Sequence, residues 1–170
     1  MKKAVCFLLL PVILSVCSSC LKQNNPELLF PQTFPYEKEV VFFSEDREID
    51  AVFTVENENS KSLRILLPEE LGGITFTESD GKRSVCANGV SFEVGREAFP
   101  EKGLLFDAFS LHADSEFLAD TRTQDGKKYT VFTHVSEDGN LLFYTDETGA
   151  LVKLAVEGAY PFVFSFKTEK

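Results

Sequence analysis

The residue types that carry most enzyme and metal chemistry are sparse in this sequence. The 170 residues include two histidines, His112 and His134, and four cysteines. The histidines lie far apart, and neither an H-x-x-x-H nor, after residue 20, a C-x-x-C spacing occurs, so we expect no metal site. A G-x-S-x-G motif, which would place a nucleophilic serine on a strained turn, is also missing. We therefore expect a non-enzymatic protein with no catalytic residues and no cofactor.

Acidic residues are abundant and gather at several points of the chain. Aspartate and glutamate number 27 against 17 lysines and arginines, which gives a net charge of −10. This balance disfavours nucleic acid and anionic lipid headgroups as partners, because both require a basic surface. Residues 45–50 and 137–140 form two clusters, and the second lacks the later glycine and glutamate of a calcium loop. We interpret both as solvated rims, and a carboxylate pair for glycoside hydrolysis stays open.

The first twenty residues carry the clearest functional signal. Lys2 and Lys3 precede an apolar run over residues 4–16, which suits a signal peptide and is shorter than the roughly 20 residues that span a bilayer. Cys17-Ser18-Ser19-Cys20 follows. Small residues before a cysteine resemble the lipobox of bacterial lipoproteins. The resemblance implies that residues 1–19 are a signal peptide and that Cys20 is lipidated. Cys17 is the other acceptor, and an ordinary secretory signal is the alternative.

The segment after this motif has the composition of a linker. Residues 20–35 contain three prolines and several polar residues, so we expect a partly extended tether between the lipid and the domain. Residues 36–170 then form one domain. With the signal removed and Cys20 modified, Cys86 is the remaining cysteine, so no internal disulfide is expected. We predict an exported protein held at the bacterial cell membrane by acyl chains.

Most of the domain alternates between apolar and polar residues. Such period-two runs predict half-buried strands, and they recur from about residue 36 to the end. The dipeptides Asp80-Gly81, Asn88-Gly89, Asp125-Gly126 and Asp138-Gly139 favour tight hairpin turns. Later glycines follow at spacings too short for parallel crossovers. The pattern indicates an antiparallel meander.

One segment has helical spacing instead. Between about Phe99 and Ala113, five apolar residues share one face of a helix, and Pro100 suits its first turn. This face needs a partner, and the sheet supplies it. The predicted fold is mainly β (α+β), with a curved antiparallel sheet that forms an unclosed barrel and one short helix over its concave face.

The second half of the chain resembles a known family. Residues 125–156 read as strand, hairpin and strand, followed by the turn Asp146-Glu147-Thr148-Gly149 and another strand. A P-E-x-L-x-G corner begins at Pro68. These features are similar to the LolA/LolB and RseB-like superfamily of lipoprotein carriers, in particular its small clostridial-type members. The resemblance implies an unclosed β-barrel around a helix, with an apolar cavity that holds acyl chains.

Two functions follow as expectations. The first is binding of an apolar ligand, a lipid or acyl chain, in a cavity between sheet and helix. The side chains expected to line it are Phe53, Ile65, Phe92, Leu105, Phe109 and Phe164. The alternative is a surface-tethered module of the cell envelope with a packed core, which senses or binds an envelope protein through a sheet edge or the acidic rim. The sequence leaves the ligand, the partner and the oligomeric state open.

Overall fold

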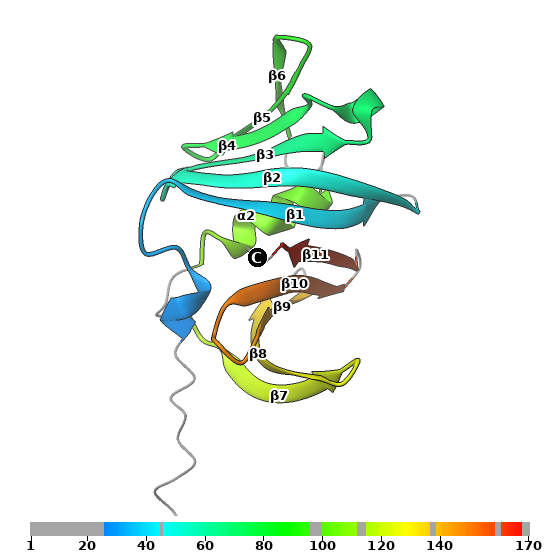
Figure 1. Ribbon diagram of the computed structural model, residues 1–170. Helices are drawn as coiled ribbons and strands as arrows, with labels where there is room; N and C mark the ends of the chain where they lie inside the picture. The colour runs from blue at the N-terminus through cyan, green and yellow to red at the C-terminus, as the bar shows by residue number, and fades with distance from the viewer. Residues whose placement is uncertain are drawn as a thin grey trace, which may run out of the picture.

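The computed structural model describes residues 26–44, 46–95, 100–111, 115–136, 139–158 and 161–167 (Figure 1). The predicted signal peptide, Cys20 and the start of the predicted tether lie outside these residues, as does His112. Within the described ranges, no helix has the length and apolarity needed to cross a bilayer.

The described chain consists mainly of strands. Its helices are the 3-10 helices η1 (Pro26–Leu29) and η2 (Glu69–Leu71) and the α-helix α2 (Pro100–Ala108). The strands are β1 (Tyr36–Ser44), β2 (Arg47–Asn57), β3 (Ser60–Leu67), β4 (Thr75–Ser79), β5 (Lys82–Ala87), β6 (Val90–Val94), β7 (Leu118–Gln124), β8 (Lys127–Ser136), β9 (Gly139–Thr145), β10 (Leu151–Gly158) and β11 (Phe162–Phe166).

All eleven strands join one antiparallel sheet. Its order is β6-β5-β4-β3-β2-β1-β11-β10-β9-β8-β7. The chain starts in the middle with β1, runs out to β6, crosses through α2 to β7 and returns to β11 beside β1. Phe42 on β1 pairs with Ile49 on β2 and with Phe164 on β11, so this register joins the two halves. Because β6 and β7 end the order at opposite edges, the sheet is open. The predicted open antiparallel fold is confirmed.

The helix α2 packs on the face of the sheet that carries the main core (Figure 1). Phe109, just after the helix, lies with its ring centroid 4.7 Å from that of Phe53 on β2. Leu105 and Phe106 are fully buried in the same contact. A second, smaller cluster of buried residues lies on the other face of β8–β10 and contains Val131, Leu142, Tyr144 and Ala155.

The helix is shorter than the sequence pattern predicts. The helix ends at Ala108. The Phe109 amide still donates to the Leu105 carbonyl four residues before it, whereas the amides of Ser110 and Leu111 donate to the carbonyls three residues before them. The Ser110 hydroxyl also donates to the Phe106 carbonyl at 3.0 Å. A tightened last turn of this kind is a common way to satisfy the final carbonyls of a helix.

Three predicted hairpin turns have the backbone that their dipeptides favour. Asp80-Gly81, Asn88-Gly89 and Asp125-Gly126 all have φ between 50° and 78°. Positive φ at both central residues is the type I′ geometry, whose twist matches that of the flanking strands. These turns fix the registers of β4–β5, β5–β6 and β7–β8.

The described part of the predicted tether is folded onto the domain. Leu29 at the end of η1 belongs to the main core, with 3% of its surface exposed. The next residue, Phe30, has its ring centroid 6.1 Å from those of Phe117 and Phe143. From Pro26 onward, the segment expected to be a partly extended tether therefore includes a 3-10 helix and apolar residues that pack on the domain.

The turn Asp146-Glu147-Thr148-Gly149 is organised by the Asp146 carboxylate. Oδ1 accepts from the Thr148 hydroxyl at 2.6 Å, the Thr148 amide at 2.8 Å and the Ala150 amide at 3.0 Å. Burial raises the pKa of Asp146, but the bonds from Thr148, Ala150 and Gly149 outweigh this effect and leave the pKa below its usual value.

The packing of Phe109 on the sheet predicts a large loss of stability on truncation. Phe109→Ala should lower the free energy of unfolding by about 3–5 kcal/mol, because it removes a buried ring and leaves a cavity. Urea denaturation followed by circular dichroism measures this. The matched control, Leu118→Ala on the exposed edge strand β7, should change stability by less than about 0.5 kcal/mol. Equal effects of the two substitutions would contradict the docking of α2.

The lowered pKa of Asp146 predicts an acid-sensitive turn. The charged form is favoured in the folded state, so its stabilisation is complete above the unfolded pKa, about 4, and is lost as pH falls through the lower folded value. Asp146→Asn keeps an acceptor oxygen and removes the titration. Below pH about 4, the wild type should lose more stability than this variant, in urea titrations at each pH. Parallel pH profiles would show that the turn bonds do not depend on charge.

Candidate functional site

Charged residues are buried on the same face of the sheet as the main core. Lys61 on β3 and Arg83 on β5 expose 2% and 7% of their surface. Glu78 on β4 stands directly opposite both in the strand registers. These three residues form a cross-strand line, named here the charged row, beside the apolar side chains that contact α2.

The charged row is tied together and to the helix. Arg83 donates from Nε to Glu78 Oε2 and from Nη2 to Asp107 Oδ1, both at 2.7 Å. Lys61 Nζ donates to Ser110 Oγ at 2.8 Å and lies 3.8 Å from Glu78 Oε1. Asp107 belongs to α2 and Ser110 to the turn that ends it. The two bonds therefore fix the C-terminal end of the helix to the sheet.

The electrostatics of the row match a structural clamp. Burial lowers the pKa of Lys61, and the carboxylates of Glu78 and Asp107 act in the opposite direction. Every member has a partner of opposite charge or a hydrogen-bonding oxygen. Breaking such a buried pair leaves an uncompensated charge, which costs about 3–5 kcal/mol. The row can therefore orient the helix, and its groups are already engaged with one another.

A groove opens beside this clamp. It has a volume of about 570 Å³ and is lined on one side by Lys61, Glu78 and Ser110. Its apolar lining includes Phe30 and Phe34, which follow η1, together with Val55, Phe109 and Leu111. We name it the η1 groove. Its size falls within the range of small-molecule sites, and its lining combines aromatic rings with a few polar groups.

The predicted ligand-lining residues fall in different places. Phe53, Leu105 and Phe164 have no exposed surface, and Ile65 has 3%. A side chain next to a water-sized void would show accessible surface. Phe53, Leu105 and Phe164 therefore line no such void in this conformation. Phe109 is the member of the set that lines the η1 groove. A ligand-lining role for the set stays a prediction.

The interior position expected of Phe92 is wrong. Phe92 lies on the edge strand β6 and exposes 58% of its surface. The alternation correctly puts its side chain on the core face, because Phe92 stands opposite Val85, which packs against the core. The core face continues beyond the part that α2 covers, so the face assignment does not imply burial.

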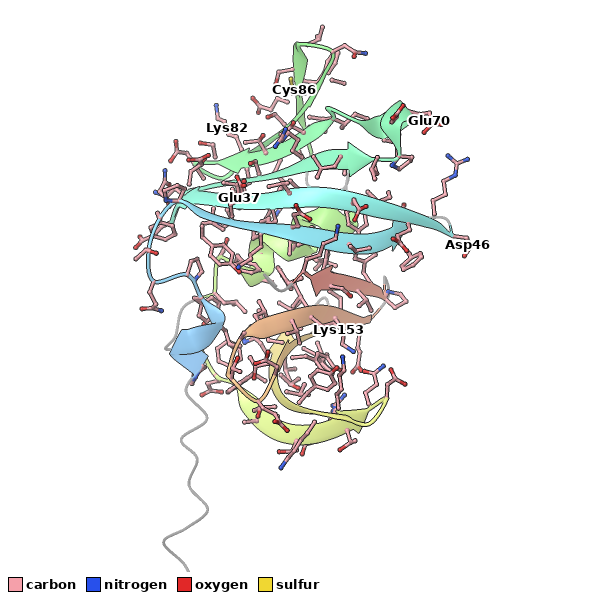
Figure 2. All side chains as sticks on the ribbon, viewed as in Figure 1. Glu37, Asp46, Glu70, Lys82, Cys86 and Lys153 are labelled. Atoms are coloured by element: carbon pink, nitrogen blue, oxygen red, sulfur yellow. The ribbon has the colours of Figure 1, made fainter. Side chains whose placement is uncertain are left out.

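The residues considered for catalysis or metal binding are dispersed. Within the described ranges, no group of three histidine, cysteine or acidic residues could hold a metal ion. Asp46, from the acidic cluster at residues 45–50, lies away from the other labelled acidic residues, Glu37 and Glu70 (Figure 2). His134 Nδ1 is 3.2 Å from the Glu116 carbonyl oxygen, and its ring lies near Phe117. Cys86 is a half-buried free thiol on β5.

The charged row was missed at the level of sequence, although the alternation contains it. Lys61 has the same parity as Leu63 and Ile65 on β3, and Arg83 has the same parity as Val85 on β5. A lysine and an arginine on core-facing positions of neighbouring strands, with a glutamate between them, is a detectable signal for a buried ionic network.

Comparison with known proteins shows a likeness of fold. No protein-family model and no curated protein sequence matches the chain. Among solved structures, a LolA superfamily protein from Nitrosomonas europaea aligns over 85% of this chain and 89% of its own, with 11% identity and a TM-score of 0.45. The Mycobacterium tuberculosis lipoprotein LppX aligns over 92% and 94%, with 10% identity and a TM-score of 0.44.

A further similar structure is the Clostridioides difficile CwlD amidase in complex with the GerS lipoprotein. One of its chains aligns over 98% of its length with 100% of this chain, at 13% identity and a TM-score of 0.48. The solved structures similar to this chain thus include a LolA superfamily protein and two lipoprotein structures, all at 13% identity or less.

The contact between α2 and the charged row predicts that the effect of Gly103→Ala on stability changes sign when Arg83 is removed. A Cβ on Gly103 would lie 2.5 Å from Arg83 Nη1, and this guanidinium is held by Glu78 and Asp107. Gly103→Ala should therefore destabilise the wild type, although alanine is favoured in helices by about 1 kcal/mol. With Arg83→Ala present, the same change should stabilise the protein. Thermal unfolding of the four proteins measures this, and additive effects would contradict the contact.

Proposed function

We propose that the chain is an exported, lipid-anchored and non-enzymatic interaction module of the cell envelope. Its partner is a protein segment that adds to the sheet along the edge strand β6. The segment we expect is extended, apolar at every second position and basic or polar between. The N-terminal lipobox-like sequence supports export and anchoring, and the domain itself supports the mode of binding.

The observation that carries this proposal is an apolar row that runs out of the core to an exposed edge. Leu63, Phe76, Val85 and Phe92 stand directly opposite one another on β3, β4, β5 and β6. Leu63 is fully buried, Phe76 and Val85 are partly buried, and Phe92 is exposed. Val90 on β6 exposes 53% as well. An added strand would continue the row by one position and cover Phe92.

The backbone of β6 supports the same mode of binding. The two-residue turn at Asn88-Gly89 makes Ala87 and Val90 a hydrogen-bonded pair, so Phe92 and Val94 also direct their amides toward β5. Ser91 and Glu93 then direct their amides and carbonyls away from the sheet. A strand added at an edge gains main-chain bonds there and specificity from alternate side chains. Glu93 and the net charge of −10 favour a partner with basic residues.

The contact between helix and sheet favours a packed core rather than a ligand cavity at this place. Leu105, Phe106 and Ala108 of α2 have no exposed surface, and neither do Phe53 and Phe164 of the sheet. A ligand between them would need to displace α2 and to break the bonds that Arg83 donates to Asp107 and Lys61 donates to Ser110.

The η1 groove favours a second candidate function. Phe30, Phe34, Phe109 and Leu111 offer apolar surface in a volume of about 570 Å³, which suits part of an acyl chain. In this alternative the protein binds an apolar ligand at the end of α2 and beneath the residues after η1, outside the packed contact of helix and sheet.

Photocrosslinking in the producing cell tests the proposal. A benzophenone amino acid at position 92 should give a discrete adduct with another envelope protein, and the same group at Thr123, on the exposed strand β7, should not. Glu93→Pro should abolish the adduct at position 92. Proline removes the outward amide that a partner strand would bond and leaves the pairing of β5 with β6 intact. The variant should unfold at the temperature of the wild type.

Three outcomes would contradict the proposal. Equal adducts at positions 92 and 123 would show unspecific contact, and an adduct with twice the mass of the chain would show self-association instead. Native mass spectrometry of the detergent-free protein should give the mass of the chain alone. A phospholipid or fatty-acid adduct that Leu111→Ala removes would favour the η1 groove.

A further inference from the structure

Two cationic side chains converge on one tyrosine on the face of the sheet that α2 does not cover. Tyr144 on β9 stands opposite Lys153 on β10, and Arg122 on β7 stands opposite Tyr129 on β8. Figure 1 shows that β7–β10 curl away from the plane of the first half, and Figure 2 shows Lys153 on this curl. We name Arg122, Tyr129, Tyr144 and Lys153 the tyrosine–cation cluster.

The two cations of this cluster contact neutral side chains. Lys153 Nζ lies 3.9 Å from the centroid of the Tyr144 ring and donates to Gln124 Oε1 at 2.7 Å. Arg122 Nη1 donates to the Tyr144 hydroxyl oxygen at 3.4 Å. The Tyr129 ring meets that of Tyr144 edge to face, with the centroids 6.1 Å apart. Tyr144 is thereby buried on the face that α2 does not cover.

The two cations of the cluster differ in how far acidic residues compensate their charge. Burial lowers the pKa of Lys153, and the Asp125 charge, which raises this pKa, acts more strongly than the Arg122 charge, which lowers it. Arg122 Nε lies 3.9 Å from the Asp120 carboxylate, in a pair whose side chains are 42% and 72% exposed. Exposed pairs of this kind contribute little, so the charge of Arg122 remains available to an anion.

We propose that the tyrosine–cation cluster binds the phosphate group of an envelope ligand between Lys153 and Arg122. Arginine offers planar donors and lysine a point charge, and both are common phosphate-binding groups. The Tyr144 hydroxyl accepts from Arg122 and can donate its own proton to a phosphate oxygen. The net charge of −10 would repel anions elsewhere on the surface, which makes a local cationic cluster selective. The source is either a soluble phosphate or a phospholipid headgroup.

Titration of the full chain with inorganic phosphate tests the site. The sequence contains four tyrosines and no tryptophan, and two of the four lie in the cluster, so a change at the cluster alters the tyrosine emission. At constant ionic strength, phosphate should give a saturable change in emission. Lys153→Met and Arg122→Gln should each weaken binding about tenfold, because each removes one charged donor. Lys82→Met on β5, in the other half of the sheet (Figure 2), should bind as the wild type does.

A further variant separates phosphate binding from a structural role. Gln124→Ala removes the acceptor of Lys153 Nζ and should keep or strengthen phosphate binding, whereas it should weaken any purely structural bridge. Vesicles of phosphatidylcholine with phosphatidylglycerol then identify the source. Binding to them that Lys153→Met removes assigns a lipid headgroup, and binding to inorganic phosphate alone assigns a soluble source. A linear response, or the same response in the wild type and in Lys153→Met, would overturn the proposal.

Discussion

A helix of nine residues cannot cover a sheet of eleven strands, and this mismatch shapes the whole domain. The helix α2 is about 13 Å long, whereas eleven strands at the usual spacing extend over roughly 48 Å. Other segments of the chain must shield the rest of the core face from solvent. Over the second half this shielding comes from Leu29 of η1, which belongs to the main core, and from the next residue, Phe30, whose ring packs near those of Phe143 and Phe117. At the far end of the first half, the core face reaches β6 and is exposed at Phe92.

The charged row follows from the same constraint. The core face beside the last turn of α2 lies between the packed centre of the sheet and the solvent, and side chains there need both length and polar partners. Lys61 and Arg83 provide the length, and Glu78, Asp107 and Ser110 provide the partners. Replacing a buried ionic network by apolar residues is often neutral for stability. The charged row contributes position instead: it fixes a short helix that could otherwise slide over a flat apolar surface.

Much of the fold was accessible from the sequence because alternation and turn chemistry are local. The strands, the type I′ turns and the face of each side chain all follow from neighbours within a few residues. Alternation does not predict whether another element packs over a given core-facing side chain. Phe92 and Phe53 have equivalent patterns, yet one is exposed and the other fully buried, because α2 reaches β2 and leaves β6 uncovered. The end of α2 was equally out of reach, since it depends on a serine that Lys61 contacts from a distant strand. The buried charges share the parity of the apolar residues, but a pattern read from apolar residues alone does not include them.

The two faces of the sheet differ in chemistry, and this difference argues for distinct roles. The core face ends in apolar side chains at β6, next to outward-facing backbone at Ser91 and Glu93, which is the chemistry of strand addition. The opposite face of the second half carries Arg122 and Lys153 around a tyrosine, which is the chemistry of an anion site. In the strand order the two regions lie at opposite ends, with the register of β1 and β11 between them. A protein segment at one edge would therefore leave the other end accessible. A domain of this size could hold a partner protein and an anionic envelope component simultaneously, without any change in the packing of α2.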